Sequence, residues 1–303
     1  MGDVATDAAA LPRARKYTSG ETLRAYYHLT KPGIIYSNAM TAVSGYIFAS
    51  LWHVQPLVLL SLVAGTMLLI ASACVLNNYI DRPLDRRMKR TQKRALVTGA
   101  VSGRSALLFA LALGVLGFVV LRGTNALTVV IGLLAVFSYV VLYGLAKRYS
   151  VHGTLVGTLP GAASLVAGYT AVTGRLDLTA LLLCLVMVAW QMPHFYAIAV
   201  RRLDDYKNAG LPVWPVRYGI QSAARQVAVY IMVFMAAGLL LTLTGHEGVI
   251  FAAGILCLGV LWLRRAWRGL RTHNDHWARE TFLFSLIALV VLAMLLPLGV
   301  LLP

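Results

Sequence analysis

Long runs of apolar residues dominate the chain and alternate with short polar or glycine-containing breaks. A helix rises 1.5 Å per residue, so about 20 apolar residues span a bilayer core of roughly 30 Å. Nine runs are long enough, and the pattern therefore predicts nine transmembrane helices. The approximate predicted spans are 34–52, 56–78, 104–121, 125–145, 153–172, 177–199, 226–244, 248–264 and 281–301.

Two of these runs contain residues that disturb a regular helix. In the fifth run, Pro160 and several glycines, among them Gly161 and Gly168, predict a kinked helix packed closely on its neighbours. In the sixth run, Pro193 is expected to kink or break the helix and to free backbone carbonyls. Irregular backbone at this depth is tolerated mainly where it lines a cavity.

The composition fits a membrane protein and excludes a water-soluble globule. Apolar residues make up 59% of the 303 residues and charged residues 13%, about half the usual share in soluble domains. We therefore predict an all-α polytopic membrane protein. Its expected organisation is a flexible cytoplasmic tail over residues 1–25 and a single intramembrane domain over residues 26–303.

Basic residues are distributed very unevenly between the predicted loops. Of 27 Lys and Arg, 25 fall on the N-terminal segment and the even-numbered loops, and only Arg122 and Arg175 fall on the other side. This asymmetry predicts a multi-pass protein of the bacterial cytoplasmic membrane with its N-terminus in the cytoplasm and its C-terminus outside. It also accounts for the net charge of +16 without a nucleic-acid partner.

A polar segment directly follows the second apolar run. Asn77, Asp81 and Asp85 recur at intervals of four residues, so in a helix their side chains lie along one face. Such oxygens suit a hard cation such as Mg²⁺, and neighbouring basic groups suit a phosphate. The segment predicts a Mg²⁺–diphosphate site at the mouth of a membrane helix; the simpler alternative is a loop that is basic only for topology. The basic residues that follow are Arg86, Arg87, Lys89, Arg90, Lys93 and Arg94.

A second polar region closes the sixth run. His194 follows Pro193, and a histidine inside a membrane span is a functional candidate, with a packing role as the alternative. Asp204 and Asp205 come ten and eleven residues later, near the cytoplasmic side. Two helices that present carboxylates on one membrane face are expected to clamp Mg²⁺ between them. The basic residues on the same face after the fourth run are Lys147 and Arg148.

These residues carry a resemblance to a known family. The chain resembles the protohaem IX farnesyltransferases (haem O synthases), a branch of the intramembrane aromatic prenyltransferase superfamily. The resemblance covers nearly the whole chain, is weaker after residue 225 and is lacking in the first twenty residues. The strings that carry it are YHLTKPG, NNYIDRPLDRRMKRTQKRALVTG, KRYSVHGTLVGTLPGAA, WQMPHFYAIAVRRLDDY and AGLPVWPV.

The resemblance implies nine helices around a central cavity, capped on the cytoplasmic side by the loops after the second and sixth helices. Asn77, Asp81 and Asp85 match the first Asp-rich motif, which holds Mg²⁺-diphosphate in the superfamily. Asn78 stands where the wider superfamily usually has Asp. The cofactor is therefore expected to be Mg²⁺.

The second Asp-rich motif departs from the superfamily pattern. Asp205 matches its last position, Arg201 occupies the first, and Asp204 is a candidate substitute ligand. An additional arginine suits a substrate that bears two propionates. The resemblance implies metal ligands Asn77, Asp81, Asp85 and Asp205; catalytic residues Asp81, Asp85, Arg90, Arg94 and Asp205; and substrate-binding residues Asn78, Lys93, Lys147, His194, Arg201, Arg202, Asp204 and Tyr206.

The implied reaction joins two substrates, farnesyl diphosphate and haem B. The farnesyl group is transferred to the haem 2-vinyl group with addition of water, giving haem O, the precursor of haem A in terminal oxidases, and pyrophosphate. Membrane lipid and a downstream haem A synthase are the other expected partners. Two alternatives are a prenyltransferase for a quinone precursor and a membrane transporter, since intramembrane His and Pro-broken helices also suit transport.

Overall fold

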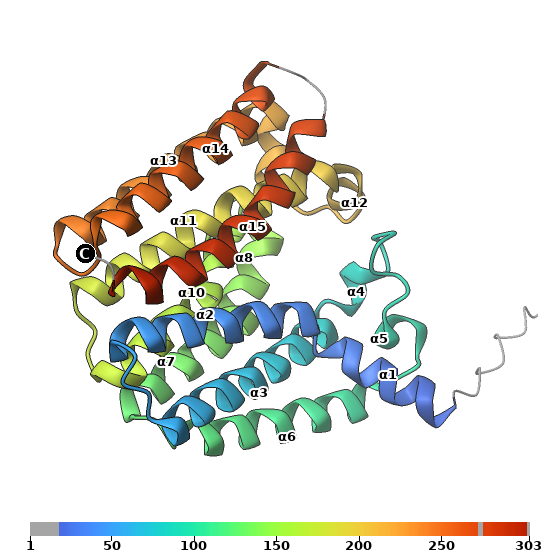
Figure 1. The fold of residues 1–303 in the computed structure, drawn as a ribbon. Helices are drawn as coiled ribbons and strands as arrows, with labels where there is room; N and C mark the ends of the chain where they lie inside the picture. Colours follow the sequence, from blue (N-terminus) through green and yellow to red (C-terminus); the bar gives the residue numbers. More distant parts are fainter. Residues whose placement is uncertain (1–17, 272–274, 302–303) are drawn as a thin grey trace, which may run out of the picture.

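The computed structural model describes residues 18–271 and 275–301, which fold entirely into helices and connecting turns (Figure 1). The elements are α1 (Ser19–Leu29), α2 (Pro32–Ser50), α3 (Pro56–Ile80), α4 (Arg82–Asp85), α5 (Ala95–Thr98), α6 (Gly103–Leu121), α7 (Ala126–Phe137), the π-helix η1 (Ser138–Leu142), α8 (Tyr143–Tyr149), α9 (Gly153–Val156), α10 (Thr158–Thr173), α11 (Leu178–Arg201), α12 (Leu203–Asn208), α13 (Trp214–Leu243), α14 (Val249–Arg271) and α15 (His276–Gly299).

The protein is an all-helical membrane protein. Eight segments of the described chain are long and apolar enough to cross a bilayer. The first predicted span corresponds to α2, which has 19 residues but lies outside these eight. Its first half carries Tyr36, Ser37 and Asn38, which lower the hydropathy of the helix. The eight segments are Pro56–Ile80, Gly103–Leu121, Ala126–Tyr149, Gly153–Thr173, Leu178–Arg201, Trp214–Leu243, Val249–Arg271 and His276–Gly299.

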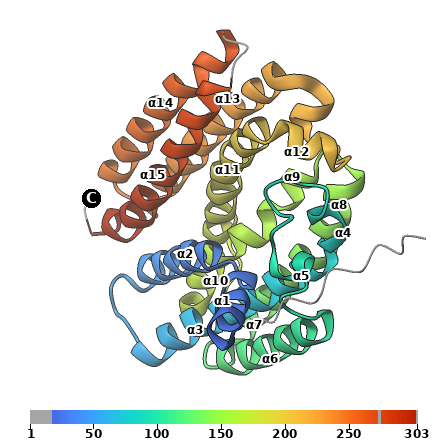
Figure 2. The same cartoon turned by 90° about the vertical axis from the view of Figure 1, so that its right-hand side faces the viewer.

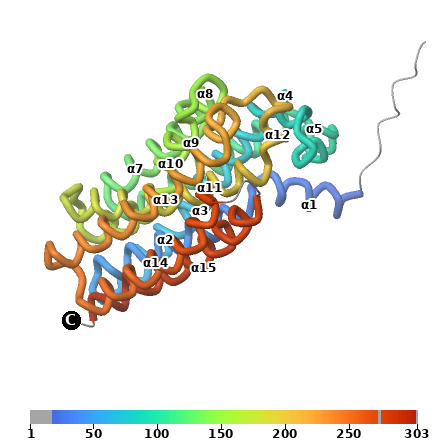
Figure 3. The backbone as a smooth tube through the Cα atoms, turned by 90° about the horizontal axis from the view of Figure 1, so that it is seen from above, coloured from blue at the N-terminus to red at the C-terminus, as the bar shows by residue number. Residues whose placement is uncertain are grey.

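The long helices form a bundle, and short helices gather at one of its two ends (Figures 1 and 2). The short helices α4 and α5, which follow α3, lie at the same end as α12, which follows α11. Helix α1 joins them there, whereas the described chain ends at the opposite end of the bundle (Figure 3). The two polar regions that the sequence singled out therefore lie at one end.

Glycines allow α2 and α10 to approach each other closely. A Cβ on Gly45 of α2 would overlap the backbone carbonyl of Leu165, and a Cβ on Gly168 of α10 would overlap the backbone of Ala42. Lipid provides little hydrophobic drive for helix association, so close backbone contact of this kind supplies the packing energy. The prediction that the fifth run packs closely on its neighbours is confirmed. The break in that run lies at Gly157, between α9 and α10.

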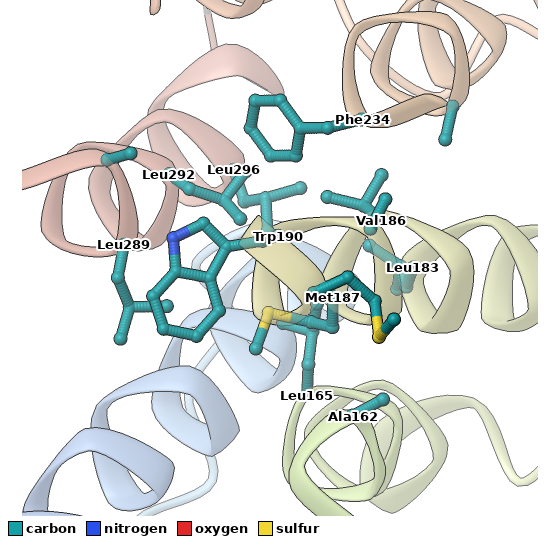
Figure 4. Packing of buried hydrophobic residues seen from close by; sticks show 14 of the residues in the cluster. Ala162, Leu165, Leu183, Val186, Met187, Trp190, Phe234, Leu289, Leu292 and Leu296 are labelled. Atoms are coloured by element: carbon teal, nitrogen blue, oxygen red, sulfur yellow. The ribbon is translucent and has the colours of Figure 1, made fainter. Parts of the chain in front are cut away.

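A continuous apolar core joins α10, α11, α13 and α15. Trp190 of α11 lies among Leu289 and Leu292 of α15 and Met187 of its own helix (Figure 4). The indole Nε1 of Trp190 donates to the Ser285 carbonyl at 2.8 Å, so its polar atom is satisfied inside the core. This core fixes the face of α11 that carries His194.

Several elements differ from the sequence-based expectations. Helix α13 begins at Trp214 rather than near residue 226, because its polar first turns escape a search for apolar runs. It bends at Gly219, whose φ of 82° favours glycine. Of the two outcomes expected at Pro193, a kink or a break, the break is wrong, since α11 continues through this residue. The predicted tail boundary at residue 25 falls within α1, and residues 1–17 lie outside the described chain.

The turn between α13 and α14 buries a carboxyl group. Glu247 is 6% exposed, packs against Gly299, and neither of its side-chain oxygens has a hydrogen-bond partner among the described residues. Burial raises the pKa of this carboxyl to about 8, against an ordinary value of 4.5. The folded protein therefore retains a proton that the unfolded chain releases.

We expect stability to fall as the pH rises from about 4.5 to about 8, because over this range the unfolded chain ionises Glu247 while burial keeps the folded state protonated. Glu247→Gln should flatten this dependence and raise Tm at pH 8 by a few degrees, at about 2–4 °C per kcal/mol. Thermal unfolding in detergent across this pH range measures both effects. Glu280→Gln, which alters an exposed ion pair with Arg268, is the control. Equal pH profiles for wild type and Glu247→Gln would contradict the assignment.

Candidate functional site

A cavity of about 450 Å³ lies between the helices at the end that carries α4 and α12. Its lining comes from α2, α3, α10, α11 and the α7–α8 segment, together with residues of the capping loops. Among the residues that line the cavity, the charged ones gather near the capping loops. Most of the other lining residues are apolar. The charged lining residues are Lys31, Asp81, Asp85, Arg90, Arg94 and Lys147.

Asp81 ends α3 and points into a cluster of cations. Its Oδ2 is paired with the ammonium group of Lys147, and its Oδ1 lies 3.5 Å from Nη2 of Arg148. Arg148 donates its hydrogen bond to the Ile80 carbonyl instead, at 2.8 Å. As a result Asp81 Oδ1 is buried without a hydrogen-bond partner within the described chain. Such an atom is available to a ligand.

Asp85 lies at the end of α4 and is held by Arg94. The Nη1 nitrogen of Arg94 lies 2.9 Å and 2.7 Å from the two carboxylate oxygens of Asp85. The same nitrogen contacts Oδ1 of Asn78 at 3.1 Å, while Asn78 Nδ2 donates to the Leu29 carbonyl at 2.9 Å. Asn78 is 2% exposed and does not line the cavity. Its observed contacts orient Arg94.

Lys31 is a site residue that the sequence analysis did not select. Its ammonium group lies 3.0 Å from Oδ1 of Asn77 and 3.4 Å from the hydroxyl of Tyr139. Burial lowers the pKa of Lys31 to about 8. The backbone at Lys31 is left-handed, with φ of 56°, and this turn directs the side chain into the cavity. Its sequence signals were its place in the string YHLTKPG, which carries the family resemblance, and its position directly before Pro32.

The π-helix η1 and the start of α8 bring two tyrosines to the cavity. Tyr139 and Tyr143 are stacked, with ring centroids 5.6 Å apart, and both line the cavity. The Lys147 ammonium lies 5.1 Å from the Tyr143 ring. A π-helical turn widens the helix locally and occurs often at functional sites. Two ring faces beside a charged site can stabilise a cation.

The second acidic region lies against the first loop, as the sequence predicts for two loops on one face. Asp205 is 8% exposed, and its Oδ1 accepts the backbone N–H of Lys89 at 3.1 Å. Asp205 itself does not line the cavity, whereas the neighbouring Tyr206 does. Burial raises the pKa of Tyr206, which keeps its hydroxyl protonated as a donor.

Four residues of the expected site lie on the outer surface in this structure. The guanidinium of Arg201 lies over the Phe282 ring, 5.2 Å from its centroid. The structure brings none of the four residues into the cavity lining, and their proposed roles in substrate binding stay predictions. The four exposed residues are Lys93, Arg201, Arg202 and Asp204.

His194 lines the deeper part of the cavity from α11. Its Nδ1 lies 2.7 Å from the Ser285 hydroxyl, and that hydroxyl lies 2.5 Å from the Phe282 carbonyl. Its ring is stacked on Trp190, with centroids 5.3 Å apart. The imidazole is therefore fixed in position by one hydrogen bond and by aromatic contacts.

The residues present fit a magnesium ion bound together with an anionic ligand. Asn77, Asp81 and Asp85 are buried oxygen donors near one another in sequence, and Asp81 Oδ1 has no hydrogen-bond partner within the described residues. Mg²⁺ is usually held by one or two carboxylates, with waters and phosphate oxygens completing its shell. Accordingly, no group of three or more His, Cys, Asp or Glu side chains gathers into a metal site in the described chain.

Comparisons of the sequence identify close relatives. Residues 38–301 match the model of the UbiA prenyltransferase family. The chain is 42% identical over 280 residues to Protoheme IX farnesyltransferase 2 of Pseudomonas fluorescens, covering 91% of this chain and 95% of the relative. It is 45% identical over 277 residues to Protoheme IX farnesyltransferase of Chromohalobacter salexigens, covering 90% and 94%.

Comparisons of the fold identify solved structures with the same architecture. A digeranylgeranylglyceryl phosphate synthase superposes with a TM-score of 0.77 at 18% identity, covering 92% of this chain and 99% of that one. A UbiA homolog from Archaeoglobus fulgidus bound to GPP and Mg²⁺ superposes with a TM-score of 0.67 at 17% identity, covering 90% and 99%. At a sequence identity of 17–18%, these superpositions show that the fold is shared and nothing beyond the fold.

Proposed function

The chain belongs to the UbiA prenyltransferase family, and from this premise we propose that it is a prenyltransferase of haem O synthesis. It transfers the farnesyl group of farnesyl diphosphate to the 2-vinyl group of haem B with addition of water, and releases pyrophosphate. The observation that carries this proposal is identity of 42–45% over nine tenths of the chain to protoheme IX farnesyltransferases. The cavity supports it, because a charged mouth and an apolar interior suit the two ends of farnesyl diphosphate.

The charged mouth suits the diphosphate group. We propose that Asn77, Asp81 and Asp85 hold Mg²⁺, which when bound would supply positive charge that compensates the departing pyrophosphate. Lys31, at the turn before α2, and Lys147 of α8 add positive charge beside Asn77 and Asp81. Residues that stabilise developing negative charge in a water-poor site lower the barrier for cleavage of the allylic C–O bond.

Arginines complete the proposed anion site. Arg90 lines the cavity, and Arg94 uses its Nη1 to hold Asp85 and Asn78, which leaves its other guanidinium nitrogens for phosphate oxygens. A planar guanidinium binds phosphate through two parallel hydrogen bonds, which an ammonium group cannot do. The stacked Tyr139 and Tyr143 rings are suited to stabilise the farnesyl cation by cation–π attraction.

Arg94→Lys is expected to lower kcat/KM by about 10–100-fold, or roughly 1.4–2.7 kcal/mol of transition-state stabilisation. The variant keeps the charge but loses the fork that joins Asp85, Asn78 and the phosphate. Steady-state haem O formation by purified protein measures the loss. Arg86→Lys, an exposed residue of the same loop outside the cavity lining, is the matched control. Full activity of Arg94→Lys would mean that this loop is basic for topology alone.

We further propose that α2 is a ninth transmembrane helix and that the capping loops face the cytoplasm. The ends of the bundle support this orientation, because α4, α5 and α12 gather at the end where most basic residues lie. Reporters fused after Gly99 should read as cytoplasmic, and those after Gly123 and Gly174 as external. An external reading at Gly99, or a cytoplasmic C-terminus, would contradict the nine-helix topology.

The test of the proposed function is haem O production by membranes that contain this protein. Membranes are supplied with haem B, farnesyl diphosphate and Mg²⁺, and haems are extracted and separated by chromatography. Haem O should appear only when all three are present. Prenylation of a hydroxybenzoate with no haem O would favour a quinone-precursor enzyme. Uptake of farnesyl diphosphate into vesicles without turnover would favour a transporter.

A further inference from the structure

An uncharged polar cluster interrupts the apolar part of the cavity below the charged mouth. Asn38 of α2, Ser164 of α10 and Gln191 of α11 all line the cavity, and they come from three helices that pack on one another. None of the three has a role in the reaction described above. We propose that this cluster binds the water molecule that adds to the farnesylated haem.

The hydrogen bonds of the cluster leave acceptor lone pairs without a partner among the described residues. Ser164 Oγ donates to Asn38 Oδ1 at 2.8 Å, and Asn38 Nδ2 donates to the Ile34 carbonyl at 2.8 Å. In this pair of hydrogen bonds the Ser164 hydroxyl acts only as a donor, so its lone pairs remain available to accept a hydrogen bond from a water. The Asn38–Ser164 pair is thereby held rigid between α2 and α10.

Gln191 supplies a second acceptor. Its Nε2 donates to the carbonyls of Thr158 and Met187 at 3.0 Å and 3.1 Å, which fixes the orientation of the amide. The Oε1 of Gln191 accepts no hydrogen bond from the described residues. This oxygen lies against Gly161, where the side chain of any other residue would overlap it. Gly161 and Ser164 are three residues apart on α10 and share a face. Gln191 Oε1, which lies against Gly161, and the Ser164 hydroxyl are therefore beside the same face of α10.

The chemistry of the reaction requires such a site, and this inference rests on the proposed function. The allylic C–O bond breaks with its electron pair on pyrophosphate, and the vinyl π electrons form the new C–C bond. The positive charge then lies on the carbon next to the porphyrin ring. Water oxygen forms a C–O bond there, and its proton passes to pyrophosphate, the base that the reaction itself generates.

Neutral side chains suit this step better than charged ones. A carboxylate beside the cation would capture it as an ester, and an ammonium group would repel it. A buried water is held by two to four polar partners, which Ser164, Gln191 and Asn38 provide. Without a water held in place, the cation loses a proton and gives an alkene 18 mass units lighter than haem O.

Product analysis by mass spectrometry in H₂¹⁸O tests the proposal. Ser164→Ala and Gln191→Met are expected to raise the ratio of alkene to alcohol at least about tenfold, which corresponds to about 1.4 kcal/mol between the two outcomes. Ser164→Thr, which keeps the hydroxyl, should retain the wild-type ratio. Ser72→Ala, which removes a buried hydroxyl bonded to the Ala110 carbonyl outside the cavity, is the control.

The product ratio separates this proposal from a structural role and from the proposed function. A slower Ser164→Ala enzyme with an unchanged ratio would overturn the water site, because a packing defect lowers the rate of both products equally. If either substitution prevents folding, the other decides, together with Gly161→Ala, whose methyl group would displace the Oε1 of Gln191. Wild-type protein that yields no farnesylated haem at all would instead refute the proposed function.

Discussion

Asp81→Asn is expected to lower kcat by about 10³-fold while the protein remains folded in the membrane. Loss of a carboxylate ligand removes charge compensation for the departing pyrophosphate, which is worth several kcal/mol of barrier, and each 1.36 kcal/mol is tenfold in rate. Asparagine fills the same volume and keeps an oxygen toward Lys147, so the local packing is retained. Asp85→Asn should have a similar effect, because Asp85 occupies the equivalent position one helical turn later.

The measurement is haem O formation over a Mg²⁺ titration, with folding followed by thermal unfolding. Glu21→Gln is the control: it removes one negative charge from the same end of the bundle, but at an exposed residue of α1 outside the cavity lining. Its activity should stay within about twofold of wild type, as for most surface substitutions. Retained activity in both Asp81→Asn and Asp85→Asn would contradict the metal assignment.

The apolar pattern predicted the helices well, because hydrocarbon imposes a length and a composition on every segment that crosses it. The apolar pattern failed where a helix begins with polar residues or contains an irregular turn. The first turns of α13 carry Arg217 and lie outside the apolar run, and η1 is an irregularity within a helix that no simple period encodes. Pro193 was expected to kink or break α11, and the helix continues through it to Arg201.

For the site, the spacing of Asn77, Asp81 and Asp85 was informative because residues four apart share a helix face, and helical backbone hydrogen bonds continue from α3 through Asp81 into α4. The spacing of residues along the sequence could not predict contacts between segments that are far apart in the chain. Lys31 reaches Asn77 only because α1 and α2 meet at a left-handed turn, and Asn78 orients Arg94 only because the loop folds back over α3. Asp205 lies near the first loop as expected, but it bonds to the backbone of Lys89 rather than lining the cavity.

His194→Ala is expected to lower haem O formation by at least about 100-fold, or 2.7 kcal/mol, while farnesyl diphosphate still binds with Mg²⁺. The Ser285 hydroxyl donates to the Phe282 carbonyl, so the His194 Nδ1–H donates to Ser285, and Nε2 keeps its lone pair. A ring fixed through one nitrogen, with the other free, is the usual arrangement of a histidine that binds a metal. We therefore expect Nε2 to ligate the haem iron.

Haem titration followed by the Soret spectrum measures this ligation separately from turnover. The band of the ligated complex should be lost in His194→Ala and partly restored when imidazole is added to His194→Gly. Ser285→Ala should weaken haem binding less than His194→Ala, because it removes only the group that orients the ring. His152→Ala, an exposed histidine outside the cavity lining, is the control. If haem binding and conversion survive His194→Ala intact, His194 is a packing residue between Trp190 and Phe282.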